Sequence, residues 1–229
     1  MAQAKRTANE SMSGHTIKAL IWDMDGTLLN TLDDIVGAVN ATLRQWGLSE
    51  KSKQALLPFI GYGARHLCHG ATGFEGDLLT QFLTEYRQMA IDRNDPETYI
   101  YPGIESLLHK SRHLGVKLGI YTNKPQKWCT KLANKFFGEG VFDAIYGTHE
   151  GGVLKPNPEG ILWMCRQWEI LPQDAVMIGD SPVDWETACN ARSLGICVTW
   201  GFRTRRVLEE AGAECIVDDS SALCDAIGF

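Results

Sequence analysis

Residues 17–27 read IKALIWDMDGT, an apolar run that gives way directly to two acidic residues. The run is short and rich in strand-forming side chains, which predicts a buried β-strand. Asp23 and Asp25 stand two residues apart, so an extended chain presents both carboxylates on one side, and Gly26 allows a sharp turn. An ordinary polar turn is the alternative, since Asp and Gly are turn residues. The paired carboxylates favour a functional site here, because open α/β sheets bind ligands at the carboxyl ends of their strands.

The rest of the chain alternates between apolar stretches and helical patterns. We expect strands at residues 116–121, 142–146, 175–178, 195–200 and 214–217, and helices at residues 103–113, 125–137, 156–168 and 182–194. Three of the helical patterns begin at a proline, which favours a helix start because its missing N–H would be unpaired there. This alternation predicts an α/β fold with a Rossmann-like, mostly parallel sheet.

One segment breaks the alternation. From Thr31 to about Ile100 there is no convincing strand, and helical patterns cover residues 32–46, 50–57, 62–69 and 77–92. We therefore predict an all-helical cap domain at residues 31–100, inserted into a discontinuous core domain of residues 17–30 and 101–229. Residues 1–16 are polar and are expected to form a flexible N-terminal extension.

Composition and charge exclude several classes of protein. The formal net charge of −6 argues against a nucleic-acid partner. No apolar run approaches the ~20 residues of a membrane span, and residues 1–16 lack the apolar stretch of a signal peptide. The seven cysteines include no C-x-x-C pair, and most have apolar neighbours, which favours free thiols in a reducing compartment. We expect a cytoplasmic monomer or homodimer that binds neither nucleic acid nor membrane.

Two further motifs after predicted strands suit a phosphate group. Thr122 and Asn123 offer a hydroxyl and an amide just before a helix start, although such residues also cap helices. Lys155 precedes another helix start and could supply a point charge to a phosphate, although a lone exposed lysine is the commoner case.

Acidic residues gather at the same predicted edge of the sheet. Asp180 follows its strand as Asp23 does, and Asp184 has the spacing of a capping box with Ser181, which is a purely structural alternative for Asp184. Together with Asp25, these carboxylates would repel a phosphate. A divalent cation removes that conflict, and carboxylate oxygens suit Mg²⁺. The sequence therefore predicts a magnesium-dependent phosphate site with a carboxylate nucleophile.

These four motifs, in this order, resemble those of the haloacid dehalogenase superfamily. The likeness covers nearly everything from residue 17 onward, and the helical insert resembles the C1-type cap of that superfamily. The resemblance implies that Asp23 attacks phosphorus to form an aspartyl phosphate, while Asp25 protonates the leaving alkoxide and later accepts a proton from water. It also implies that Mg²⁺ is held by Asp23, Asp180 and the backbone carbonyl of Asp25, with Asp184 nearby.

The resemblance further implies which residues hold the substrate, a small phosphorylated metabolite. Thr122, Asn123 and Lys155 would hold the transferring phosphoryl group, Thr122 and Lys155 as part of the catalytic set, and Gly26 would be a further substrate contact. The stretches 59–64 and 122–125 resemble the phosphoglycolate phosphatase subfamily, which implies 2-phosphoglycolate as substrate. Arg65 could then meet the substrate carboxylate, although an exposed helical arginine is the commoner case.

Single residues argue for or against the other activities known on the same fold. A dehalogenase lacks the second acidic residue, so Asp25 argues against it. A phosphonate hydrolase uses a cap lysine, which residues 61–65 do not offer. A sugar phosphomutase of the β-phosphoglucomutase kind shares every core residue and remains an alternative. A non-catalytic phosphate-binding module is a further alternative, against which the presence of both Asp23 and Asp25 argues.

Overall fold

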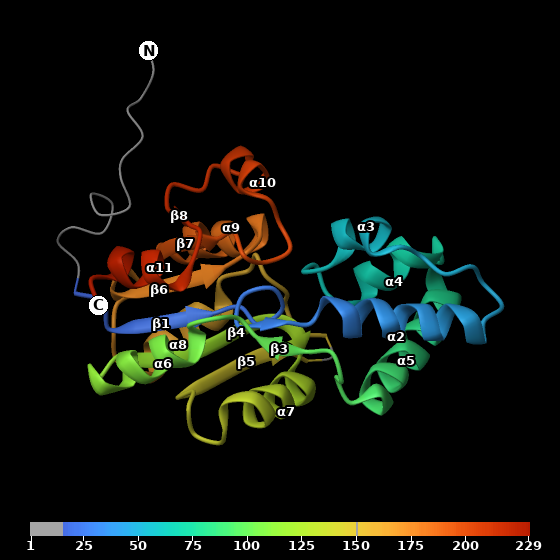
Figure 1. Ribbon diagram of the computed structural model, residues 1–229, viewed down its shortest axis with the longest axis horizontal. Helices are drawn as coiled ribbons and strands as arrows, with labels where there is room; N and C mark the ends of the chain where they lie inside the picture. Colours follow the sequence, from blue (N-terminus) through green and yellow to red (C-terminus); the bar gives the residue numbers. More distant parts are fainter. Residues whose placement is uncertain (1–15, 150) are drawn as a thin grey trace, which may run out of the picture.

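The computed structural model describes residues 16–149 and 151–229 (Figure 1). Of the expected N-terminal extension, residues 1–15 lie outside this described part. Within it, a six-stranded parallel sheet has the order β5-β4-β1-β6-β7-β8. Its strands are β1 (Ala19–Trp22), β4 (Lys117–Pro125), β5 (Ala144–Thr148), β6 (Ala175–Gly179), β7 (Leu194–Val198) and β8 (Ile216–Val217). The predicted α/β fold with a parallel sheet is confirmed.

Strand β1 lies in the middle of the sheet and is buried along its whole length. Leu20 and Trp22 pack into the apolar cluster on one face, and Ala19 and Ile21 pack into the cluster on the other. The first face is covered by α6 (Ile104–His113), α7 (Gln126–Phe137) and α11 (Ser220–Ile227), and the second by α8 (Glu159–Gln167) and α9 (Pro182–Ala191). This double cover explains why the strand reads as a continuous apolar run. The short elements η2 (Pro172–Asp174) and α10 (Arg205–Glu210) complete the core.

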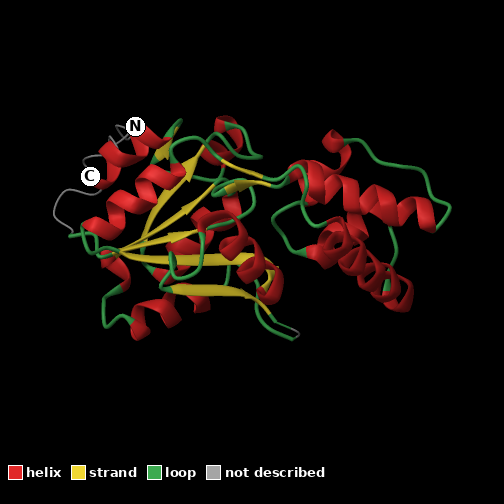
Figure 2. Ribbon diagram, turned by 60° about the horizontal axis from the view of Figure 1, so that its bottom comes forward, coloured by secondary structure: helices red, strands yellow, loops and turns green. Residues whose placement is uncertain are grey.

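The helices of residues 32–93 form a separate body beside the sheet (Figures 1 and 2). We call this body the cap, and it consists of α2 (Leu32–Gln45), α3 (Lys53–Leu56), η1 (Leu57–Phe59), α4 (Ala64–Thr72) and α5 (Gly76–Arg93). Its helices enclose their own apolar cluster, in which Val39, Leu67 and Phe82 are buried. The cap therefore has a hydrophobic core distinct from the two clusters on the sheet.

Two short strands join the cap to the core. Strand β2 (Leu29–Asn30) pairs antiparallel with β3 (Tyr99–Ile100). Strand β3 lies inside the range in which the sequence pattern predicted no strand. Two residues are too few to show a periodicity, and the pairing with β2, far away in the sequence, gives them their strand conformation.

Helix α8 also differs from its prediction, because it begins at Glu159 and not at Pro156. The Oδ1 atom of Asn157 accepts a hydrogen bond from the backbone N–H of Glu159 at 2.9 Å, so a turn precedes the helix. Among the described residues, no helix is both long and apolar enough to cross a membrane.

Candidate active site

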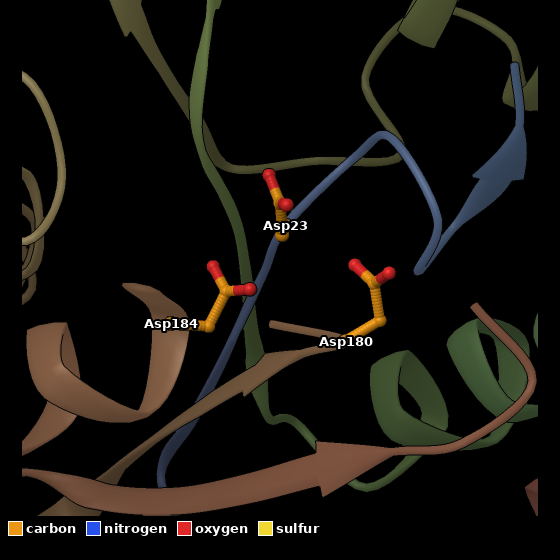
Figure 3. A group of neighbouring side chains, drawn as sticks. All are labelled: Asp23, Asp180 and Asp184. Atoms are coloured by element: carbon orange, nitrogen blue, oxygen red, sulfur yellow. The ribbon is translucent and has the colours of Figure 1, made fainter. Parts of the chain in front are cut away.

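Three buried carboxylates meet where β1 and β6 end. Asp23 directly follows β1, Asp180 directly follows β6, and Asp184 lies in the first turn of α9. Figure 3 shows the three side chains gathered around a common space. Their exposed fractions are 6%, 2% and 1%, and one oxygen atom of each lies within 4.8 Å of the other two. The parallel sheet thus brings together residues that are more than 150 positions apart in the chain.

Neighbouring groups hold Asp180 in a fixed orientation. Its Oδ1 accepts from Thr27 Oγ1 at 3.2 Å, and its Oδ2 accepts from the backbone N–H of Phe202 at 2.6 Å. Burial, followed by the charges of Asp184 and Asp23, raises the pKa of Asp180 to about 8. A cation among these carboxylates would offset the burial and the repulsion between them, and so would lower the pKa of Asp180.

Gly26 gives Asp180 its space. The Gly26 backbone has a φ of +87°, and a Cβ atom there would stand 2.4 Å from Asp180 Oδ2. The N–H of Gly26 donates to the carbonyl of Leu29 at 2.8 Å, which closes the turn after β1. In this structure Gly26 shapes the site through its backbone and the absence of a side chain.

Lys155 lies between two of the carboxylates. Its Nζ is 2.8 Å from Asp23 Oδ1 and 2.6 Å from Asp184 Oδ1, and the residue is 4% exposed. Burial alone would lower the pKa of Lys155, but the two carboxylates outweigh it and raise that pKa above its usual value. Burial raises the pKa of Asp23 to about 6, against the opposing charge of Lys155. Lys155 is thus a buried cation beside the expected nucleophile.

Asp184 combines the structural and the functional interpretation of its motif. Its Oδ2 accepts from the backbone N–H of Ser181 at 3.1 Å, as part of the capping box at the start of α9, and from Ser181 Oγ at 2.6 Å. Its Oδ1 accepts from Lys155. One carboxylate oxygen caps the helix and the other faces the site.

The three carboxylates fit a hard divalent cation. Their donor atoms are all oxygen, they are buried, and Asp23, Asp180 and Asp184 together carry more negative charge than Lys155 balances. Mg²⁺ prefers such oxygen ligands and usually keeps several waters. The residues present therefore suit Mg²⁺ better than a soft metal, which would favour sulfur or imidazole.

The side chain of Asp25 turns to different partners. Its Oδ1 accepts from Thr31 Oγ1 at 2.7 Å, and Lys124 Nζ lies 2.9 and 3.1 Å from its two oxygens. The structure does not bring the Asp25 carboxylate into the group of three. The sequence pattern assigned no role to Lys124, although it follows Thr122 by two residues in β4, a spacing that places both on the same side of a strand.

Asn123 connects the core with the cap. Its Nδ2 donates to the backbone carbonyl of Gly61 in the cap at 2.9 Å, and its Oδ1 accepts from the N–H of Lys155 at 2.7 Å. Arg203, which no sequence motif singled out, also reaches the cap and donates through Nη2 to the carbonyl of Ile60 at 2.7 Å. These contacts hold the loop after η1 against the site.

A cavity lies between the sheet edge and this loop. Asp23, Asp25, Thr122 and other side chains of the core line it from one side, and residues of the cap line it from the other; the full lining is Asp23, Asp25, Ile35, Ile60, Gly61, Gly63, Ala64, Leu67, Tyr86, Thr122, Asn123, Lys124, Pro125 and Trp128. The structure does not bring Arg65 into this group. Arg65 is exposed and donates to Thr80 Oγ1 at 3.3 Å.

Known proteins are similar to this chain over most of its length. The model of the family described as haloacid dehalogenase-like hydrolase matches residues 20–198. The phosphoglycolate phosphatase of Psychrobacter arcticus is 30% identical over 215 residues, which cover 90% of this chain and 94% of that protein. The phosphoglycolate phosphatase of Rhodospirillum rubrum is 31% identical over 230 residues, covering 93% and 91%. A solved structure from Lactobacillus delbrueckii subsp. bulgaricus has a TM-score of 0.86 at 29% identity and covers 93% of this chain and 98% of that chain.

The family match spans the carboxylate cluster as well as Thr122 and Lys155. Relatives of nearly full coverage carry a phosphatase name. This chain therefore belongs to the haloacid dehalogenase-like hydrolases, and it is a phosphatase of that family.

Proposed function

We propose that the protein is a Mg²⁺-dependent phosphomonoester hydrolase that acts on 2-phosphoglycolate through an aspartyl phosphate on Asp23. The position of Asp23 is the observation that carries this proposal. Its carboxylate lies 2.8 Å from the ammonium of Lys155, next to two further carboxylates, and lines the cavity under the cap. The printed names of the relatives support the substrate.

Asp23 is the proposed nucleophile and Asp25 the proposed acid and base. A carboxylate oxygen of Asp23 forms a bond to phosphorus while the phosphorus–ester oxygen bond breaks, and Asp25 gives a proton to the leaving oxygen. Asp25 then takes a proton from a water molecule whose oxygen attacks phosphorus. The bond between phosphorus and Asp23 breaks, which releases inorganic phosphate and restores both side chains.

The surrounding residues would hold the phosphoryl group and the metal. Lys155, Thr122 and Asn123 would contact the phosphoryl group, and Lys155, whose ammonium lies 2.8 Å from Asp23, would supply positive charge. Side chains of Asp23, Asp180 and Asp184 would hold Mg²⁺, together with the backbone carbonyl of Asp25. When bound, the ion supplies positive charge to the phosphoryl oxygens.

The cap would restrict the site to small substrates and exclude bulk water. We propose that residues 31–100 act as a cap domain over a core of residues 17–30 and 101–229. The cavity beneath the cap measures about 50 Å³, far below the ~300 Å³ or more of a typical ligand pocket. A leaving group of a few atoms, such as glycolate, would fit this small cavity better than a sugar ring would.

Phosphate release from 2-phosphoglycolate tests the proposal. We expect turnover with Mg²⁺, its loss in EDTA and its return when Mg²⁺ is added back. Asp23→Asn should lower kcat by about a thousandfold or more, because the nucleophile is lost. Asp33→Asn is the matched control, since Asp33 is a half-exposed carboxylate on the cap that pairs with Lys53.

Two outcomes would contradict the proposed function. One is wild-type turnover by Asp23→Asn or in EDTA. The other is conversion of a sugar phosphate to its isomer without release of inorganic phosphate, which would favour the phosphomutase.

A further inference from the structure

We infer that Lys124 determines specificity by binding a carboxylate on the leaving group of the substrate, an inference that rests on the proposed function. Lys124 lies at the end of β4, is 7% exposed and lines the cavity under the cap. Its Nζ is 2.9 and 3.1 Å from the oxygens of Asp25 and 4.4 Å from the ring centre of Trp128. The roles proposed above for phosphate transfer do not use this buried ammonium group.

Of the described side chains that line the cavity, Lys124 is the one suited to bind an anion on the leaving group. Among the described residues that line the cavity, Lys124 has the one cationic side chain. The cap contributes apolar side chains there, including Ile35, Ile60 and Leu67. A lysine ammonium has three N–H donors, and the described hydrogen bonds of Lys124 Nζ all go to Asp25. A further acceptor in the cavity would therefore meet a buried positive charge.

The order of Asp23, Asp25 and Lys124 along the cavity indicates where on the substrate this hydrogen-bond acceptor must lie. The phosphorus must lie at Asp23, and the ester oxygen that leaves must lie at Asp25, which protonates it. Lys124 is in direct contact with Asp25. A carboxylate on the carbon that bears the ester oxygen is only two bonds from that oxygen, so it comes within reach of Lys124.

The same arrangement disfavours neutral leaving groups. A hydroxyl in place of the carboxylate would leave Lys124 with no new charge to pair with. Charged hydrogen bonds contribute about 1.5–3 kcal/mol, which corresponds to about 10- to 100-fold in affinity. The substrate class is thus a small phosphomonoester whose ester carbon carries a carboxylate.

Two substrates of matched size test this role. 2-Phosphoglycolate and 2-hydroxyethyl phosphate differ in a carboxylate against a hydroxymethyl group. The measurement is the ratio of kcat/KM for the first to kcat/KM for the second, in the wild type, Lys124→Met, Lys124→Gln and Lys124→Arg. Lys127→Met is the control, because Lys127 is an exposed lysine at the start of α7 and does not line the cavity.

We expect the ratio to fall about 10- to 100-fold in Lys124→Met and Lys124→Gln, mainly through a higher KM for 2-phosphoglycolate. Lys124→Arg keeps the charge and should keep most of the ratio, and Lys127→Met should leave it unchanged. If Lys124→Met does not fold by circular dichroism, Lys124→Gln decides the matter, because its amide still donates to Asp25.

An unchanged ratio in the neutral Lys124 variants overturns the inference, even where both activities fall, since equal losses mean that Lys124 only positions Asp25. This outcome is distinct from failure of the proposed function. In that case the wild type itself releases no phosphate from either compound.

Discussion

Asp180 shows most directly how the site lowers the free energy of unfolding of the metal-free protein. Its pKa rises from 3.8 to about 8 through burial and the neighbouring charges of Asp184 and Asp23. Between these values the folded protein keeps a proton that the unfolded chain has lost, so the free energy of unfolding falls as the pH rises. We expect the melting temperature in EDTA to fall from about pH 4 to about pH 8 and then to level off.

The same residue predicts how Mg²⁺ and a neutral variant behave. At pH 8, Mg²⁺ should raise the melting temperature of the wild type, because a ligand that binds the folded state stabilises it. Asp180→Asn should melt higher than the wild type in EDTA, yet gain little from Mg²⁺ and lose activity. Thermal melts with and without Mg²⁺ check this, with Asp33→Asn as control. A melting temperature of Asp180→Asn that equals the wild-type value in EDTA would argue against charge repulsion in the site.

Gly26 gives a second prediction at the scale of one residue. Gly26→Ala adds a Cβ at 2.4 Å from Asp180 Oδ2 and strains a backbone with φ of +87°. Gly138→Ala is matched, because Gly138 has φ of +90° and no atom within 4 Å of its would-be Cβ. Both variants should lose about 1–3 kcal/mol of unfolding free energy through the backbone. Only Gly26→Ala should also lose activity and the stabilisation by Mg²⁺, measured by phosphate release and thermal melts.

Between elements, the loop after η1 depends on a few contacts with the core. Arg203 donates to the carbonyl of Ile60, and Asn123 donates to the carbonyl of Gly61. We expect Arg203→Met to loosen this loop, raise KM several-fold and speed amide hydrogen exchange across residues 57–64. Arg206→Met is the control, since Arg206 is exposed and pairs with Glu210 within α10. Unaltered exchange in Arg203→Met would mean that Asn123 and apolar packing hold the loop without Arg203.

The elements differ in how far the sequence could predict them. The strands around β1 were predictable because burial on both faces makes each one a continuous apolar run. Strand β3 was not, because it exists through pairing with β2. In the site, Asp23 and Asp180 follow from strand ends, and the sheet brings them together as expected. The contact of Lys124 with Asp25 and that of Arg203 with the cap depend on long-range packing, which local patterns do not contain.

At the scale of the whole molecule, the exposure of the cysteine thiols shows how tightly the core and the cap are packed. Cys189 is exposed and Cys224 partly so, whereas the other five of the seven cysteines are buried: Cys68, Cys129, Cys165, Cys197 and Cys215. Burial raises the pKa of these five thiols, which lowers their reactivity further. Ellman's reagent should label two thiols quickly in the native protein and all seven in denaturant. Rapid labelling of a third native thiol would contradict the packing described. Cys189→Ser should remove the thiol that reacts fastest with the reagent.

The placement of β1 also bears on how the chain is made. In the sheet, Ala19 pairs with Lys117 on one side and with Ala175 on the other. A ribosome therefore releases the central strand long before either neighbour, while the helices of residues 32–93, contiguous in the chain, emerge in between and can pack on their own. The first strand to be synthesised has no neighbour on its second edge until β6 has emerged. A nascent chain that stops before Ala175 leaves the backbone N–H and C=O groups on one edge of β1 unpaired and open to chaperones or to aggregation.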